Sequence, residues 1–452
     1  MRQGPNERLM ALMTEARCSN KGLARRLTDI AATRNLRGVR VDHNDVRKWR
    51  AGMLPQEPKP AMIADVLTEQ LGRRITLADI GMESSSARDI ALDFLPSVEG
   101  LVAVADRLWT RDSEGISDAD KDTVSAAALT TPIYRWMTAT PLKLRDGPSS
   151  RQFALGDMSA LTHMADMFTS AVNRYGGGHI RASAVEFLRR DIAPLLRMSH
   201  TESVGRQLFT TAGHMAFLVG DMSYDVAHHA LARRYFALSL NLAHASGDRV
   251  LGARVLVRMS HQATFLGEYR EAAELARAAR VGAAACLPNR AMAAIAAMEA
   301  RAMSAAGDAV GCDRALLDAE TTFNRVDQDA DPAWFRYFDE AELVDEFGHC
   351  FRDLGRSEHA AEYAEQAIAT STPDYPRSRV FTRFVLAAAL LQSGDEERAC
   401  TEALLALHDI ERIRSERVRV YLSDFCAQLQ RRATRPASDF LEQANLLLAA
   451  HQ

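Results

Sequence analysis

The stretch that decides the fold is SHQATFLGEYREAAELARAA, residues 260–279. Its turn residue, Gly267, follows a small residue, Ser260, by seven positions and precedes Ala272 and Ala279 by five and twelve. Small residues at such spacings around a turn are what two antiparallel helices need where they pack closely. The stretch therefore predicts a helical hairpin.

The same pattern occurs five times along the chain. The turn residues recur at intervals of 40, 40, 48 and 39 residues, and they are Ala227, Gly267, Gly307, Gly355 and Gly394. In every copy the three positions seven before, five after and twelve after the turn hold only small residues: Gly220, Ser260, Ala300, Gly348 and Ala387; Ala232, Ala272, Cys312, Ala360 and Ala399; Ser239, Ala279, Ala319, Ala367 and Ala406. A repeat of this length predicts an array of stacked helical hairpins, since one hairpin alone cannot bury its apolar face.

These columns resemble the tetratricopeptide repeat, as in Gly267-Glu-Tyr-Arg-Glu-Ala, although the units are longer than the ~34-residue standard. The resemblance covers about residues 210–410. It implies an all-α fold in which a right-handed superhelix, expected here over residues 156–452, carries a concave groove lined by the first helix of each pair. A triple glycine at 176–178 lacks the strand before it and the Lys-Ser/Thr after it of a phosphate-binding loop, so it predicts a helix break.

The inward-facing positions of the repeat, carried over to this chain, imply a groove of ionisable and aromatic side chains. They are His214, Phe217, Asp221, Tyr224, Arg254, His261, Phe265, Arg301, Glu342, Asp345, His349, Arg352, Phe381 and Phe384. Such a lining suits a peptide or a small polar effector. The alternative is a face that is simply solvated.

The charge of the chain is divided unevenly. Residues 1–82 hold 15 Lys/Arg against 9 Asp/Glu, whereas the remainder holds 40 against 50. A basic head on an acidic body is typical of a nucleic-acid-binding module joined to a domain that does not bind nucleic acid.

Four helices are expected in this head. The first runs from Asn6 to Glu15, and the second follows Ser19 as its N-cap. The third, His43–Arg50, begins after Asp42, ends before Gly52 and has only Val46 and Trp49 as apolar residues, on one face. The fourth follows a proline-rich turn and turns Met62, Ile63, Val66 and Leu67 inward.

The head resembles the lambda-repressor-like, XRE-type helix-turn-helix domains. The residues that carry the resemblance are Leu23-Ala24, Val46 to Trp49 followed by Gly52, and Ile63-Ala64 with Leu67. The connection from Ala32 to Val41 is longer than the turn of that family. A plain four-helix bundle with a solvated third helix is the alternative.

The resemblance implies double-stranded DNA as a partner. Phosphate contacts are expected from Ser19, Asn20, Lys21, Arg25, Arg37 and Arg40. The third helix would enter the major groove with His43, Asn44, Arg47, Lys48 and Arg50, where Arg47 suits guanine and Asn44 suits adenine. One head reads a half-site, so a homodimer on a palindromic operator is expected.

Residues 83–155 are expected to form a connecting helical segment and linker, with helices over Leu92–Trp109 and Lys121–Met137. The sequence contains 13 histidines and six cysteines, but neither set has metal-ligand spacing. There is no GxSxG, Walker or GxGxxG motif. We therefore expect no catalytic residues, no metal and no cofactor. No apolar run reaches membrane length and the N-terminus lacks a signal sequence, which favours the cytoplasm.

The two modules together resemble actinobacterial transcriptional regulators that join an XRE-type head to tetratricopeptide repeats. The sequence thus predicts a DNA-binding regulator whose repeats mediate dimerisation and sense an effector. A repeat-based scaffold or adaptor without specific DNA binding is the alternative from another functional class.

Overall fold

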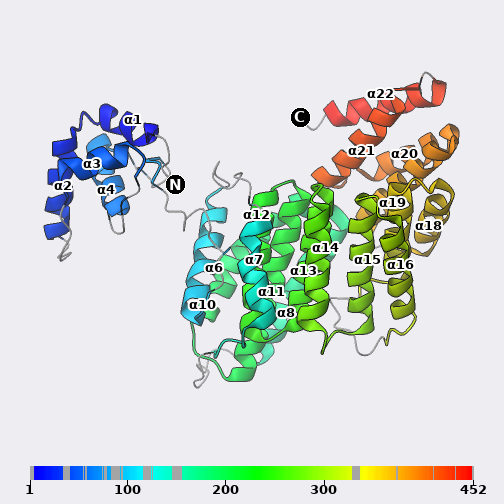
Figure 1. Cartoon of the computed structure of the whole chain (residues 1–452), viewed down its shortest axis with the longest axis horizontal. Helices are drawn as coiled ribbons and strands as arrows, with labels where there is room; N and C mark the ends of the chain where they lie inside the picture. The colour runs from blue at the N-terminus through cyan, green and yellow to red at the C-terminus, as the bar shows by residue number, and fades with distance from the viewer. Residues whose placement is uncertain are drawn as a thin grey trace. The chain divides into compact units, whose positions relative to one another are not determined.

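The structure, a computed structural model, consists of two compact units, residues Met1–Ile90 and Ala91–Gln452 (Figure 1). It describes residues 5–33, 41–53, 55, 59–73, 75, 79–82, 92, 95–115, 124, 126–144, 155–327, 336–372, 375–410, 412–432 and 434–449. Every regular element of this described part is helical, as the repeat pattern predicts. None of its helices combines the length and the apolar composition that crossing a bilayer takes.

The first unit contains α1 (Glu7–Glu15), α2 (Asn20–Thr33), α3 (His43–Arg50) and α4 (Lys59–Leu71) around one core. In α2 and α3 the N-cap is the residue that the sequence predicts. The backbone N–H of Gly22 donates to Ser19 Oγ at 3.1 Å, and those of Asn44 and Asp45 donate to Asp42 Oδ1 at 2.8 Å. Both predicted N-caps are therefore confirmed.

The core of the first unit also holds the predicted apolar faces. Val46 and Trp49 of α3 are buried, as are the four inward residues expected in α4. The core extends beyond α4 to Ile75, Ile80 and Met82. The chain after α4 is fastened to the start of α1, because Asn6 Nδ2 donates to the carbonyl oxygen of Ile80 at 2.9 Å.

The second unit is a series of helices, and from α11 to α20 the two helices of each successive pair pack against each other as an antiparallel hairpin (Figure 1). Those before the repeat are α6 (Val98–Ser113), η2 (Ala126–Leu129), α7 (Thr130–Thr138), α8 (Leu155–Tyr175), η3 (Gly177–His179), α9 (Arg181–Phe187), the π-helical turn η4 (Leu188–Ile192) and α10 (Ala193–Leu196). The repeat comprises α11 (Glu202–Asp225), α12 (His229–Ser246), α13 (Arg249–Phe265), α14 (Tyr269–Ala283), α15 (Asn289–Ala305), α16 (Ala309–Phe323), α17 (Glu340–Asp353), α18 (Ser357–Thr370), α19 (Pro376–Ser393) and α20 (Glu396–Ile410). Two further helices, α21 (Glu416–Leu429) and α22 (Arg435–Ala449), follow.

The five predicted hairpins are confirmed as the helix pairs α11–α12, α13–α14, α15–α16, α17–α18 and α19–α20. Each of the five aligned turn residues is in the left-handed region, with φ between 63° and 93°. Four are glycines, which adopt this conformation readily, and the fifth is Ala227.

The small residues at the three repeated offsets are all buried. The contacts show why larger side chains are excluded. A Cβ at Gly220 would lie 2.7 Å from Phe236 Cε1 across the first hairpin. In the second, Ser260 Oγ donates to the carbonyl oxygen of Ala272 at 2.7 Å, so the two helices meet at repeat positions.

The segment expected as a connection contributes two helices that pack within the second unit. The first, α6, begins at Val98 after its Ser97 N-cap, six residues after the predicted start at Leu92, and the second, α7, begins at Thr130. In a buried network Arg181 Nη2 donates to both Asp112 oxygens, at 2.7 and 2.6 Å, and Tyr235 donates to Asp112 Oδ2 at 2.6 Å. These bonds join α6, α9 and α12.

Trp136 of α7 fills the space between α13 and α14. It is fully buried, and a Cβ at Gly252 or Gly282 would come within 2.2 or 2.1 Å of its ring. The two glycines thus provide the space for the indole.

The triple glycine is a helix break, as predicted, and it is also a junction between distant segments. Gly176 has φ 79°, and a Cβ at Gly177 would lie 2.7 Å from Met222 Cα. The N–H of Gly178 donates to the carbonyl of Arg414 at 3.2 Å, and the N–H of Arg414 donates to the carbonyl of Tyr175 at 3.0 Å. The segment just before the repeat therefore contacts the segment just after it.

Asp225 stabilises this junction from the end of α11. It is fully buried, accepts from the N–H of Gly177 at 2.9 Å and from Ser415 Oγ at 2.8 Å, and pairs with Arg377 at 3.3 Å. One carboxylate thus links η3, α19 and the N-cap of α21. These contacts join the segment before the repeat to the fifth hairpin and to the segment after it, and in this sense they close the array.

We expect Ala272→Leu to destabilise the second unit by about 1–3 kcal/mol, because its added atoms have no space where α13 and α14 touch. The measurement is the thermal melting temperature. Ala278→Leu is the matched control, since Ala278 lies on the same helix and is half-buried. Equal melting curves for the two variants would contradict the close packing at the repeat positions.

Candidate functional site

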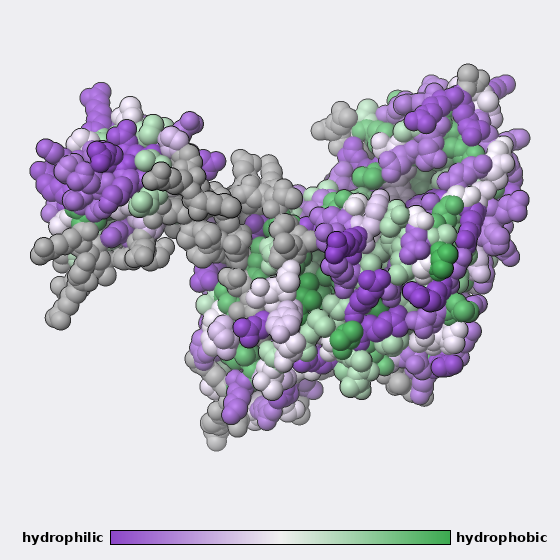
Figure 2. Space-filling model, viewed as in Figure 1, coloured by the Kyte–Doolittle hydropathy of each residue, from purple (hydrophilic) through white to green (hydrophobic). Residues whose placement is uncertain are grey.

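The exposed face of α3 is the first candidate site. Val46 and Trp49 face the core, whereas His43, Arg47 and Lys48 are exposed and Asn44 is half-buried. His43, Arg47 and Arg50 are spaced four and three residues apart and therefore share one helical face. The face of this unit seen in Figure 2 is mostly hydrophilic.

Two predicted DNA contacts are engaged with each other. The guanidinium of Arg50 donates through Nη1 to Asn20 Oδ1 at 3.0 Å, which joins the end of α3 to the start of α2. Lys21 and Arg25 on α2 are exposed and four residues apart, and Ser19 is also exposed while it caps that helix. Arg37 and Arg40 lie outside the described residues.

The second candidate site is a polar cluster inside the second unit, with two cavities beside it. The smaller, about 100 Å³, is lined from α13, α15, α17, α19 and α21, among others by Arg258, His261, Arg301, Asp345 and Arg417. The larger, about 500 Å³, is lined among others by Phe265, Arg352, Phe384 and Phe425. Both cavities share His261, Arg301 and Tyr421 as walls.

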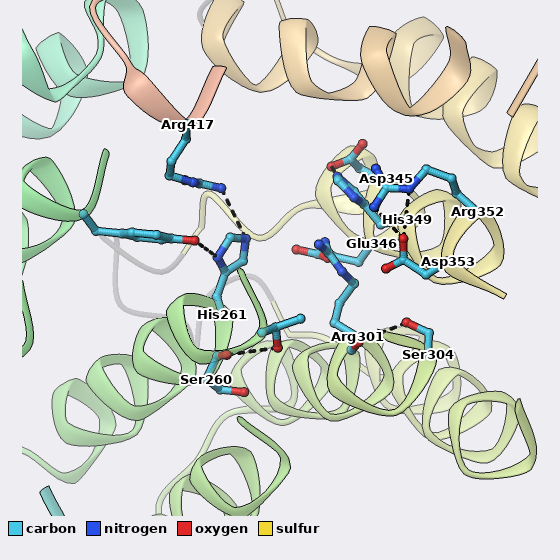
Figure 3. A network of polar contacts seen from close by, with 12 residues as sticks. Ser260, His261, Arg301, Ser304, Asp345, Glu346, His349, Arg352, Asp353 and Arg417 are labelled. Atoms are coloured by element: carbon cyan, nitrogen blue, oxygen red, sulfur yellow. Dashed lines mark hydrogen bonds and ion pairs between the residues drawn. The ribbon is translucent and has the colours of Figure 1, made fainter. Parts of the chain in front are cut away.

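His261 stands at the centre of one half of the cluster (Figure 3). Its Nδ1 is 2.9 Å from the Tyr224 hydroxyl and its Nε2 is 3.5 Å from Arg417 Nη2. A guanidinium can only donate, so Nε2 accepts and the proton of the neutral ring lies on Nδ1. Burial, followed by the charge of Arg417, holds the pKa of His261 well below its usual value, which agrees with a neutral ring.

Arg417 is held among aromatic rings. Its guanidinium carbon lies 4.5 Å from the ring centre of Tyr224, 4.8 Å from that of Phe381 and 5.8 Å from that of Phe265. The residue is 6% exposed. Cation–π attraction of this kind stabilises a desolvated cation.

The other half of the cluster lies on α15 and α17 (Figure 3). Arg301 Nη1 donates to Glu346 Oε2 at 2.5 Å, and His349 Nε2 is 3.6 Å from Asp345 Oδ2. In the view of Figure 3, Arg301 lies between His261 and the acidic side chains of α17. The cluster therefore connects the second, third and fourth hairpins.

The acidic groups of α17 are strongly perturbed. Burial and the neighbouring Glu346 and Asp345 raise the pKa of Glu342 to about 8. Burial and Glu346 raise the pKa of Asp345 to about 7. Burial and the neighbouring carboxylates outweigh the attraction of Arg258 for Glu342 and of Arg301 and Arg352 for Asp345.

The groove residues predicted in the first hairpin are interior rather than cavity-lining. His214, Phe217, Asp221 and Tyr224, together with Arg254 of the second hairpin, are all buried, and none lines either cavity. Arg254 Nη1 is 3.1 Å from His214 Nε2, and Asp221 pairs with Arg258 at 3.1 Å. An open groove is therefore the wrong description of the first hairpin, because α8, η3 and α9 pack against α11.

The other predicted groove residues do line the cavities. The smaller cavity contains His261, Arg301, Glu342, Asp345, His349 and Phe381, and the larger contains His261, Phe265, Arg301, Arg352 and Phe384. These residues come from four different hairpins. They meet at the cavities because each occupies the inward-facing position of its own repeat unit.

Sequence reasoning missed several members of the cluster. Arg258 lies four residues after Arg254 and Glu346 three residues before His349, so helical spacing would have found both. Arg417 and Tyr421 come from α21, beyond the repeat, and no sequence spacing connects them to it.

Among the described residues, no group of three or more His, Cys, Asp and Glu side chains is placed to hold a metal ion. His349 Nε2 and Asp345 Oδ2 lie 3.6 Å apart, and the cavity that they line also contains Arg301 and Arg417.

Comparison with known families matches residues 9–83 to the SP15 N-terminal domain. The match covers the helices of the first unit and only a minor part of the chain. Comparison with curated proteins and with solved structures found no match.

The raised pKa of Glu342 predicts how stability depends on pH. Between its unfolded value near 4.5 and its folded value of about 8, the folded state holds a proton that the unfolded state has lost. Stability therefore falls as pH rises through this window. The buried histidines, whose folded pKa values are lowered below 6.5, oppose this trend up to about pH 7.5, but they do so equally in wild type and in a Glu342 variant.

We expect the melting temperature of wild type to fall more steeply between pH 6.5 and 8 than that of Glu342→Gln. Glu340→Gln, an exposed residue on the same helix, should follow wild type. Parallel curves for wild type and Glu342→Gln would show that Glu342 is ionised throughout this range.

Proposed function

We propose that the protein is a DNA-binding transcriptional regulator whose first unit reads DNA and whose helical array responds to an effector. The observation that carries the DNA-binding half is the geometry of α3. The helix is capped, anchored through Val46 and Trp49, and presents His43, Arg47 and Lys48 to solvent. A rigid helix with a basic outer face can enter a major groove.

The charge distribution supports the same assignment. The excess of six positive charges in residues 1–82 gives an electrostatic attraction to phosphates, whereas the acidic remainder opposes it. Lys21 and Arg25 on α2 provide further exposed cations beside α3. In this proposal they contact the DNA backbone, and Arg47 contacts base edges.

The helix-turn-helix assignment of this unit and the tetratricopeptide assignment of the array are part of the proposal. The four-helix order, the caps at Ser19 and Asp42 and the left-handed turn residues support them. A half-site reader of this size is expected to act as a homodimer on a palindromic operator. The proposed response of the helical array to an effector is supported by the cavities, where buried charged groups from several hairpins converge.

Arg47→Ala tests the docking. Loss of a base contact costs about 1–3 kcal/mol, so affinity for an operator selected from random duplexes should fall roughly 5- to 150-fold. Fluorescence anisotropy at fixed salt measures it. The melting curve should not change, because Arg47 is exposed.

Arg8→Ala on α1 is the matched control, since it removes the same charge from an exposed position of the same unit. It should weaken binding much less. If no duplex is selected by the full chain, or if both variants lose the same small amount of salt-sensitive affinity, the adaptor interpretation replaces this proposal.

A further inference from the structure

The smaller cavity contains a buried guanidinium, that of Arg417, which forms no ion pair with any described residue. No carboxylate of the described part lies within 4.0 Å of the Arg417 guanidinium, and its buried Nε has no hydrogen-bond partner. Among the described residues, the hydrogen bond that this side chain makes is the 3.5 Å contact with His261. Leaving a cation buried without a counter-charge is costly.

A second guanidinium in the same cavity has a similar defect. Arg301 pairs with Glu346 through Nη1, but its Nε is buried and has no hydrogen-bond partner. Arg301 is 6% exposed and lies on the wall between the two cavities. The unused N–H donors of Arg301 and Arg417 suit an anionic group.

The opposite side of the smaller cavity has the opposite defect. Asp345 Oδ1 is buried without a hydrogen-bond partner, while Oδ2 faces His349. Glu342 lines the same cavity, and its neighbours on α17 are also acidic. A cationic group with N–H donors would supply what these carboxyl groups lack.

We propose that the cavity binds a small zwitterion that carries an amine and a carboxylate, such as a free amino acid or a dipeptide. The carboxylate binds Arg417 and Arg301, and the amine binds Asp345 and Glu342. The rest of the ligand extends past Arg301 toward Phe265 and Phe384 in the larger cavity.

The size of the space agrees with this class. The larger cavity, about 500 Å³, lies in the range of ~300–1,000 Å³ that holds small ligands. Its walls include Phe265, Phe384 and Phe425, which suit an apolar or aromatic side chain. A ligand with only one charge would leave either the guanidiniums or the Asp345 oxygen without a partner.

The occupant would also bridge the array. Arg301 belongs to the third hairpin, Asp345 to the fourth and Arg417 to α21. This inference rests on the proposed function only in treating the cavity as the effector site. Binding is measured without DNA, so the two can fail separately.

The test screens the full-length protein by thermal melting against the twenty free L-amino acids and a set of L-dipeptides at millimolar concentration, with calorimetry on each compound that raises the melting temperature. Propionate and propylamine serve as probes with one charge. We expect at least one zwitterion to bind, and we expect its N-acetylated and C-amidated forms to lose at least tenfold in affinity.

Arg417→Met retains much of the apolar contact with the surrounding rings but removes the guanidinium, and it should lose at least tenfold in affinity. Asp345→Asn should also lose at least tenfold. Arg419→Met, on the same helix but outside both cavities, is the control and should bind as wild type. Arg417→Lys should recover part of the binding.

The proposal is overturned if no zwitterion raises the melting temperature of wild type, if a blocked form or a probe with one charge binds as tightly, or if Arg417→Met binds unchanged. Should Arg417→Met fail to fold, Asp345→Asn and the blocked ligands still decide the outcome.

Discussion

The second unit depends on the burial of one carboxylate, that of Asp225. A fully buried charge is tolerated only when hydrogen bonds and an ion pair replace its hydration. Here a backbone N–H of the glycine junction, the hydroxyl of Ser415 and the guanidinium of Arg377 do so. Because these groups come from before, within and after the repeat, satisfying Asp225 requires the array to close. Closure then brings α21, with Arg417 and Tyr421, over the concave side.

Closure changes what the repeat can do. In an open array the inward positions of every hairpin would face solvent, and buried charges would not occur there. In the closed array Asp221 and Arg254 become interior groups, while His261, Arg301 and Asp345 line confined cavities. Charged atoms left without partners in such a space have a strong requirement for a complementary ligand. The chemistry of the cavities thus follows from the way the chain ends are joined.

In the first unit the features that the sequence predicts are local, because the caps, the apolar faces and the exposed basic residues lie within single helices. Its core and several of its polar contacts join distant residues, as Asn6 and Ile80 do. The contact between Arg50 and Asn20 likewise ties together two helices across a long connection. Asn20 and Arg50, both predicted to contact DNA, thus hold α2 against α3. Arg47 is the arginine of α3 that is exposed.

Periodicity and capping were sufficient to predict the all-helical fold, the five hairpins with the positions of their turns, and the start of α3, because these depend on interactions between residues a few positions apart. The same periodicity predicted that His261, Arg301 and His349 share an inward register. It did not predict that Gly176–178 would contact Arg414, or that Arg417 would reach His261, since those contacts join residues more than 150 positions apart. Only the tertiary structure decided these two contacts. They depend on how far each hairpin is rotated relative to the one before it, and small differences in packing accumulate along the array.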